Sequence, residues 1–162
     1  MQALNTVYLS LGSNVGDSLS HMGAACSMIE KRIGAIRQQS SLYTTAAWGN
    51  TQQPDFVNQV IILETKLDCN GLMQTILEIE QEMGRIRTVK NAPRIIDIDI
   101  LFYNDSIIEE DNLRIPHPLI QDRNFVLTPL MELSPNWVHP VLQQTIRELQ
   151  QACADTLPVK KK

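Results

Sequence analysis

The hydrophobic pattern of the 162-residue chain predicts alternating strands and helices. Strand-forming residues fill four stretches, alternating with polar ones in the first and forming a run of Val and Ile in the third, where they suggest a central strand. The predicted strands cover residues 6–12, 35–45, 56–67 and 95–103. Apolar residues at helical spacing predict two helices, each followed by a glycine that can end it. Asp17 or Ser18 can cap the beginning of the first helix. These helices cover residues 18–33 and 70–83.

The order strand, helix, strand, strand, helix, strand is typical of a ferredoxin-like α/β sandwich. We therefore expect an α+β fold with a mainly antiparallel sheet and helices packed on its faces. A hairpin near residues 104–105 and helical segments at 124–135 and 141–152 are expected to be added to this unit. Since no repeat or linker divides the chain, residues 1–162 are expected to form a single domain, with 158–162 as a flexible tail.

Composition and charge narrow the class of function. The formal net charge of −4 argues against a broad nucleic-acid-binding surface, which needs an excess of basic residues. The three cysteines have no CxxC spacing, so neither a disulfide framework nor a zinc site is expected. There is no apolar run of membrane-spanning length and no signal-peptide pattern, so we expect a cytoplasmic protein that contacts no membrane.

Two aspartates interrupt the last predicted strand, which has the sequence PRIIDIDILFY at 93–103. Residues two apart in a strand face the same side, so Asp97 and Asp99 share one face and the neighbouring isoleucines pack on the other. A solvated sheet face that discourages aggregation would explain the pair. Such a face would more naturally carry Thr, Lys or Glu, so both aspartates are also candidates for chemistry.

Basic residues on both sides of this strand favour the chemical interpretation. They are Arg85, Arg87, Lys90 and Arg94 before the aspartates, and Arg114, His117 and Arg123 after them. Paired carboxylates suit Mg²⁺, which prefers oxygen ligands and keeps waters that substrate phosphates can replace. Guanidinium groups bind phosphate oxygens through charge-assisted hydrogen bonds. The pattern therefore predicts a phosphoryl-transfer site, with a surface salt-bridge network as the alternative.

Three further features each have two interpretations. The glycine-rich LGSNVGDS at 11–18 lacks the known phosphate-loop patterns, so a plain strand-to-helix turn is favoured over phosphate binding. His117 lies between two prolines, and a structural role and a phosphate contact are equally supported. Trp48, Phe56 and Phe125 are expected in the core by default, although the loop position of Trp48 also suits a ligand site.

The segment KNAPRIIDIDILFY resembles the signature of the 6-hydroxymethyl-7,8-dihydropterin pyrophosphokinase family, enzymes of folate biosynthesis. The pattern Lys/Arg-x-Gly/Ala-Pro-Arg-x-x-Asp-x-Asp, followed by aliphatic residues, is satisfied by residues 90–101. Similarity extends from YLSLGSN through YTTAAWG and PDFVNQV to the His-Pro pair at 139–140. The resemblance implies a diphosphokinase that transfers pyrophosphate from ATP to the hydroxymethyl group of the reduced pterin and releases AMP.

The resemblance also implies roles for individual residues. Asp97 and Asp99 would hold two Mg²⁺ ions that bind ATP, and Arg85 and Arg94 would act beside them in catalysis. The residues implied around the nucleotide and its phosphates are Glu80, Arg85, Arg87, Lys90, Arg94, Ile100, Arg114, His117 and Arg123. A flat pterin can stack between aromatic rings while an Asn amide reads its polar edge. The residues implied there are Thr45, Ala46, Ala47, Trp48, Phe56, Asn58 and Phe125.

A protein of a different class could carry part of the same pattern. The alternative is a non-catalytic, ferredoxin-like module that binds a small ligand. Release of AMP from ATP that depends on the reduced pterin would separate the two. The expected partners are therefore small molecules, ATP and the reduced pterin, with neither nucleic acid nor membrane. Whether a protein partner exists does not follow from the sequence.

Overall fold

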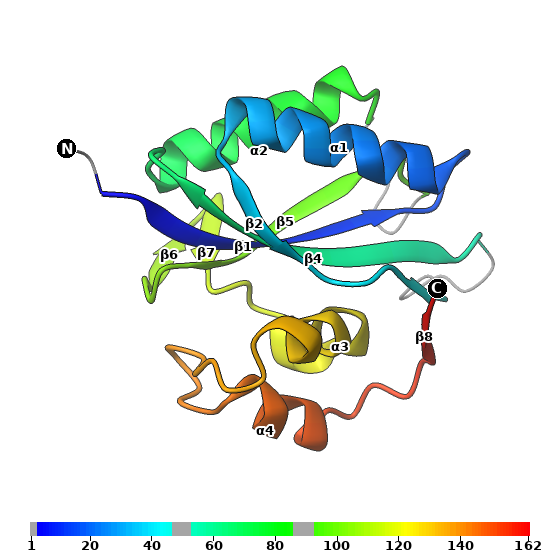
Figure 1. Cartoon of the computed structure of the whole chain (residues 1–162). Coiled ribbons are helices and arrows are strands. Elements are labelled where there is room, and N and C mark those ends of the chain that lie inside the picture. Colours follow the sequence, from blue (N-terminus) through cyan, green and yellow to red (C-terminus); the bar gives the residue numbers. More distant parts are fainter. Residues whose placement is uncertain (1–2, 47–52, 86–92) are drawn as a thin grey trace.

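A six-stranded antiparallel sheet forms the centre of the protein (Figure 1). The computed structural model describes residues 3–46, 53–85 and 93–162. The strands of this sheet are β1 (Asn5–Ser13), β2 (Ile36–Gln39), β3 (Tyr43–Thr45), β4 (Phe56–Thr65), β5 (Asp97–Tyr103) and β8 (Val159–Lys161). They pair in the order β5-β1-β4-β3-β8. β2 also pairs with β4, at residues 61–63, whereas β3 pairs with residues 56–58 of β4. The predicted antiparallel arrangement is confirmed.

Helices cover both faces of this sheet, as Figure 1 shows. One face carries α1 (Ser18–Arg32) and α2 (Cys69–Glu82), and the other carries α3 (Asn124–Leu133) and α4 (Ile146–Ala152). A separate hairpin of β6 (Ile108–Glu110) and β7 (Leu113–Ile115) follows β5, and the short helix η1 (Ile120–Asp122) leads into α3. This layering confirms the predicted α+β class. No helix among the described residues is both long and apolar enough to cross a membrane.

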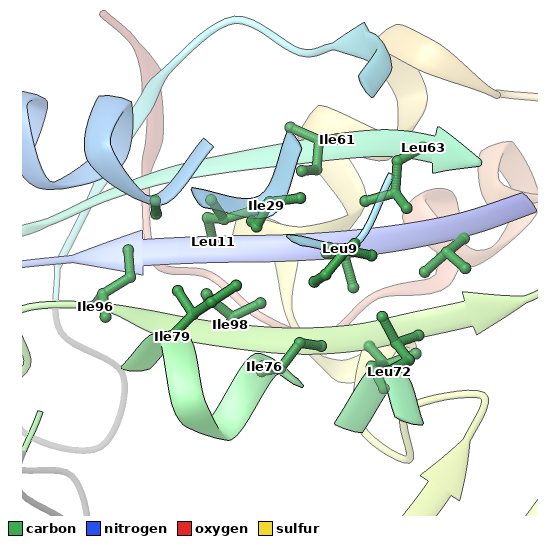
Figure 2. Packing of buried hydrophobic residues seen from close by; sticks show 14 of the residues in the cluster. Leu9, Leu11, Ile29, Ile61, Leu63, Leu72, Ile76, Ile79, Ile96 and Ile98 are labelled. Atoms are coloured by element: carbon green, nitrogen blue, oxygen red, sulfur yellow. The ribbon is translucent and has the colours of Figure 1, made fainter. Parts of the chain in front are cut away.

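The larger core lies between the sheet and the α1–α2 layer (Figure 2). Leu9 and Leu11 of β1 pack there with Ile29 of α1 and with Ile76 and Ile79 of α2, and all five are fully or almost fully buried. Each apolar side chain removed from water stabilises the fold by roughly 1.5–3 kcal/mol. The helices were predictable because their apolar residues recur at helical spacing.

Strand alternation then decides which way the aspartates face. Ile98 and Ile100 of β5 point into the larger core, so Asp97 and Asp99 face the layer of α3 and α4. Beyond Asp99 the register with β1 shifts between Tyr8 and Leu9. The first half of β5 therefore places its two aspartates on the α3 face of the sheet. The apolar end of β5 packs into a second core on the same face.

The second core closes the far end of the α3 face. Tyr8 and Phe102 meet edge to face with ring centroids 5.5 Å apart, and Trp137 stacks on Tyr8 at 5.8 Å. Leu127 and Leu130 of α3 are fully buried against them. This packing holds α3 against the sheet, so the beginning of α3 lies over the aspartates.

Three predicted boundaries are wrong. The predicted strand 35–45 is two strands, because the Ser40 side chain turns back to bond with Ser41 O at 2.8 Å and interrupts the ladder. The predicted helix 141–152 begins only at Ile146, because Thr145 caps it with Glu148 in a reciprocal capping box. The hairpin after β5 turns between β6 and β7 at residues 111–112, whereas residues 104–105 form a separate turn that ends β5.

The expectation of a flexible tail at 158–162 is also wrong. Val159–Lys161 forms β8, which pairs with β3, and Lys162 N–H donates to Leu42 O at 2.8 Å. The physical reason is the edge of β3, whose backbone groups would otherwise remain without a strand partner.

Gly34, just after the end of α1, lies directly against the backbone of β4. A Cβ at this position would overlap the carbonyl group of Glu64 on β4. We expect Gly34→Ala to lower the free energy of unfolding by about 2 kcal/mol, because a packed backbone must move. The matched control is Gly23→Ala, within α1, where a Cβ meets nothing within 4 Å. Urea unfolding should show a gain of about 0.5–1 kcal/mol for this control, and equal effects of the two changes would contradict the close approach.

Candidate active site

Asp97 and Asp99 lie in a pocket between the sheet and the beginning of α3, which we call the slot. Its walls come from β1, β3, β4, β5 and the segments that join them. The residues lining the slot are Ser10, Gly12, Thr45, Ala46, Gln53, Phe56, Asn58, Arg94, Asp97, Asp99, Arg123 and Phe125. The structure thus brings Arg94 and the two aspartates, which are close in the sequence, together with Arg123 and with aromatic residues from distant segments.

A second and larger pocket, which we call the trough, lies on the other side of Asp99. Its cavity volume is ≈ 920 Å³ against ≈ 60 Å³ for the slot. Residues of β5, α2, the β6–β7 hairpin and the segment after β7 line it, among them Ile100, Arg114 and His117. Asp99 lines both pockets, so the slot and the trough adjoin at this residue.

Two guanidinium groups hold the Asp97 carboxylate. Arg85 Nη1 lies 2.8 Å from Asp97 Oδ1, and Arg94 Nη1 lies 2.8 Å from Asp97 Oδ2. Arg85 also contacts Glu80 Oε2 at 2.6 Å, and this same oxygen accepts the backbone N–H of Ile98 at 2.8 Å. Glu80 is buried, so it fixes both Arg85 and the register of β5 from below the site.

Asp99 has a different environment from its neighbour. Burial raises its pKa to about 7, the negative charge of Asp97 adds to the effect, and the positive charges of Arg123 and Arg85 oppose it. The nearby arginines therefore do not fully offset the cost of burying the ionised Asp99 carboxylate. A bound divalent cation would supply further positive charge.

The donor set fits Mg²⁺. Two carboxylates on one strand face offer oxygen ligands and leave the other coordination positions to water and to substrate oxygens. Among residues 3–46, 53–85 and 93–162, no group of three or more His, Cys, Asp or Glu could hold a metal ion. A site built wholly from such side chains, as zinc requires, is therefore absent from this part of the chain.

His117 lies beside Arg123 at the rim of the trough. Its backbone N–H donates to Leu101 O at 3.1 Å, and its Nδ1 accepts the backbone N–H of Leu119 at 3.1 Å. The hydrogen-bond geometry thus assigns the proton of the neutral ring to Nε2. Burial and the charge of Arg123 lower the pKa of His117 to about 4. His117 is therefore a neutral N–H donor at neutral pH, a form that can still bind a phosphate oxygen.

Aromatic and amide groups form the opposite end of the slot. Phe56 and Phe125 are only half-buried and both line the slot, and Phe125 also packs against the second core. Asn58 Nδ2 donates to Thr45 Oγ1 at 2.8 Å. A Cβ at Gly12 would come within 3.0 Å of Asn58 Oδ1, so glycine keeps space for that amide. The arrangement suits a flat, polar-edged ring.

Asn14 is a buried residue beside the slot that the sequence did not single out. Its Nδ2 donates to Gln53 Oε1 at 2.6 Å and to Pro54 O at 3.0 Å, and its Oδ1 accepts Arg94 N–H at 2.8 Å. The turn after β1 therefore joins the segments that carry two slot residues, Gln53 and Arg94. Ser10, Gly12 and Gln53 were missed as well. The available signal was an Asn directly after a buried strand, since a buried amide needs partners.

The other predicted site residues either agree with this geometry or lie outside it. Ala46 lines the slot, and so does Arg123, which the sequence places among the residues around the nucleotide phosphates. Ala47, Trp48, Arg87 and Lys90 lie outside the described residues.

Comparison with known proteins relates the chain to enzymes of pterin metabolism. The model of the family described as 7,8-dihydro-6-hydroxymethylpterin-pyrophosphokinase matches residues 8–135. The 2-amino-4-hydroxy-6-hydroxymethyldihydropteridine pyrophosphokinase of Aquifex aeolicus is 40% identical over 145 residues, which are 90% of each chain. The enzyme of the same name from Synechocystis sp. is 39% identical over 98% of this chain and 82% of its own.

Some similar proteins are much longer. A folic acid synthesis protein of Dictyostelium discoideum is 40% identical over 90% of this chain but over only 22% of its own length. The chain thus spans about a fifth of that protein. Among solved structures, a triple mutant of Plasmodium falciparum HPPK-DHPS has a TM-score of 0.77 at 21% identity, covering 93% of this chain and 43% of that one. At this identity the likeness shows a shared fold alone.

Proposed function

The chain belongs to the 7,8-dihydro-6-hydroxymethylpterin-pyrophosphokinase family, and from this membership we propose that it is a diphosphokinase of folate biosynthesis. It would transfer the terminal diphosphate of ATP to the hydroxymethyl group of 6-hydroxymethyl-7,8-dihydropterin and release AMP. The observation that carries the proposal is the meeting of the slot and the trough at Asp99. Two substrates bound in these pockets would have their reacting groups beside the same two carboxylates.

The pterin would occupy the slot. Phe56 and Phe125 offer ring faces for stacking, and the Asn58 amide, held by Thr45, can read the donors and acceptors of the pterin edge. Ala46 lines the same end, and we assign Ala47 and Trp48 to this site from the family pattern alone.

ATP would occupy the trough, with its triphosphate directed towards Asp97 and Asp99. Ile100, Arg114 and His117 line the trough, and the Nε2–H of His117 can donate to a phosphate oxygen. The residues that would gather the phosphates are Arg85, Arg87, Lys90, Arg94 and Arg123, with Glu80 behind Arg85. Of these, Arg87 and Lys90 are assigned from the sequence.

Asp97 and Asp99 would hold two Mg²⁺ ions. When bound, Mg²⁺ neutralises charge on the phosphate oxygens around the transferred group. The chain's own contribution is positioning: Arg85 and Arg94 hold Asp97 in the free protein and have donors for phosphate oxygens once the nucleotide is present. Their charge lies where negative charge shifts during transfer, which is how a fixed cation accelerates such a reaction.

A cytoplasmic location belongs to the same proposal. Cys26, Cys69 and Cys153 are all free thiols, which suits a reducing compartment. The substrates proposed are both small molecules, and the net charge of −4 supports a protein that does not bind nucleic acid.

The alternative, a small-ligand-binding module without catalysis, is tested by turnover. A binding module would bind ATP or the pterin and leave ATP intact. The proposed enzyme should consume ATP only when the reduced pterin is present. A coupled assay of AMP formation, with and without the pterin, decides between them. An equal rate of ATP consumption in the presence and absence of the pterin would contradict the proposed reaction.

ATP affinity is expected to depend strongly on Mg²⁺. Without the ion, a triphosphate would meet Asp97 and Asp99 directly, and two like charges about 4 Å apart repel by about 4 kcal/mol at an intermediate dielectric. We expect calorimetry with a non-hydrolysable ATP analogue to show binding at least about a hundredfold weaker in EDTA than in Mg²⁺. Equal affinity in the two buffers would contradict the assignment of both carboxylates.

A further inference from the structure

β8 covers the outer edge of the shortest strand that reaches the slot. β3 pairs with β4 on one side and with β8 on the other, with Tyr43 opposite Lys161 and Thr45 opposite Val159. Thr44 Oγ1 donates to Lys160 O at 3.3 Å, which adds a side-chain contact to the ladder. Without β8, these three residues would be an edge strand with one partner, and short edge strands open easily.

β3 carries the Thr45 end of the slot. Thr45 is buried, lines the slot and accepts the Asn58 amide at 2.8 Å. Tyr43, two residues earlier on the same face, donates its hydroxyl to Glu132 Oε1 of α3 at 2.7 Å. A shift of β3 would therefore displace Thr45 and its contact with Asn58.

β8 contributes little to either core. Both hydrophobic clusters of the described residues end by Cys153, and Val159 is only half-buried. Lys160 and Lys161 are exposed. Because little apolar surface is buried there, the loss of β8 pairing is expected to leave the rest of the fold in place. Figure 1 shows β8 rising from the α4 side to the end of the sheet.

We propose that β8 is a positioning strand for the pterin slot: its pairing with β3 holds Thr45 and Ala46 where they bind the pterin. The inference rests on the proposed function, since the slot is where that function places the pterin. The proposal predicts an effect on one substrate only. Loss of the β8–β3 pairing should weaken pterin binding, whereas the trough shares no residue with β3 and ATP binding should not change.

The strand ladder supplies a matched pair of variants. Lys162 N–H bonds to Leu42 O, and hydrogen-bonded pairs alternate along an antiparallel ladder. Thr44 and Lys160 are therefore the next hydrogen-bonded pair, and the N–H of Lys161 points away from β3. Lys160→Pro removes a ladder donor, and Lys161→Pro leaves the ladder donors in place because the N–H of Lys161 points outward, where proline is tolerated. The charge of Lys161 also acts on Glu132, so Lys161→Gln is measured beside it to separate the loss of that charge from the insertion of proline.

The test measures three properties of each variant: the Kd of the reduced pterin with Mg²⁺ and a non-hydrolysable ATP analogue present, the Kd of that analogue, and the Tm. We expect Lys160→Pro to raise the pterin Kd roughly tenfold with the other two properties unchanged. Lys161→Pro should match the wild type in all three. A chain ending at Leu157 should behave as Lys160→Pro, and amide exchange at Thr44 should be faster in both.

Three results would overturn the inference. They are unchanged pterin binding in Lys160→Pro, equal weakening by both prolines, and a joint loss of ATP-analogue affinity and Tm, which would make β8 a general structural element. Wild-type protein that fails to bind the reduced pterin would instead overturn the proposed function, and the inference with it.

Discussion

Asp99→Asn is expected to lower kcat by about 10³ or more while leaving the protein folded. The change keeps the shape of the side chain and removes the charge that lies between the slot and the trough. Metal-assisted stabilisation of a transferred phosphoryl group is worth several kcal/mol, and each 1.4 kcal/mol is about a tenfold change in rate. The loss should therefore appear in kcat more than in the pterin Kd.

The two aspartate variants should differ in thermal stability. Burial raises the pKa of Asp99, so the ionised side chain destabilises the metal-free fold at neutral pH and its removal should leave Tm equal or higher. Asp97→Asn should also abolish turnover but should lower Tm. The two variants differ because Asp97→Asn breaks ion pairs at 2.8 Å with Arg85, a largely buried cation, and with Arg94.

These effects are measured by steady-state kinetics beside thermal unfolding in metal-free buffer at pH 8. Asp105→Asn is the matched control, since Asp105 is exposed in the turn after β5 and lies in neither pocket. It should retain wild-type kcat and Tm. Full activity in Asp97→Asn or Asp99→Asn would contradict the assignment of these carboxylates.

Arg94→Ala is expected to lower the rate of transfer by about 10²–10³, with a much smaller effect on the pterin Kd. Arg94 lines the slot and contacts Asp97, one of the two carboxylates proposed to hold Mg²⁺. A fixed cation at that point acts on charge that develops during transfer, and loss of one such donor costs about this factor. Arg94→Lys should recover only part of the rate, because an ammonium group lacks the planar, forked donors.

Single-turnover rates beside equilibrium pterin binding would test this expectation. Arg37→Ala is the control, because Arg37 pairs with Glu64 on the surface and its side chain is 58% exposed. That variant should match the wild type in both measurements. A defect confined to pterin binding in Arg94→Ala would reassign Arg94 as a residue that binds the pterin.

The sequence predicts elements well where local pattern and tertiary packing agree. The period of two in IIDIDI places Asp97 and Asp99 on one face because Ile98 and Ile100 fill the larger core on the other. Asp17 caps α1 as predicted, accepting Ser20 N–H at 3.2 Å. In both cases the residues that decide the structure are neighbours in the sequence.

Prediction fails where distant residues decide. β8 exists because β3 needs an edge partner, and Thr44 and Lys160 are 116 residues apart. Ser40 divides a stretch that looks like one strand, because its side chain and backbone bond with Ser41 and Val60. No local pattern contains these partners.

The candidate site shows the same division. Its charged residues were visible as a cluster in the sequence, but the sequence could not show that Glu80 fixes both Arg85 and Ile98. Nor could it show that Asn14 joins the segments of Gln53 and Arg94. Both are buried polar groups whose partners come from other elements, so only the folded chain reveals them.

The most direct test of the proposed reaction is the identity of its products. Purified protein, Mg²⁺, ATP and 6-hydroxymethyl-7,8-dihydropterin would be incubated together, and the phosphorus-containing products followed by ³¹P NMR and mass spectrometry, with Asp99→Asn in parallel. We predict AMP and pterin diphosphate in equal amounts from the wild type and neither from the variant. Formation of ADP with a pterin monophosphate, or an unchanged pterin beside intact ATP, would contradict diphosphoryl transfer by this site.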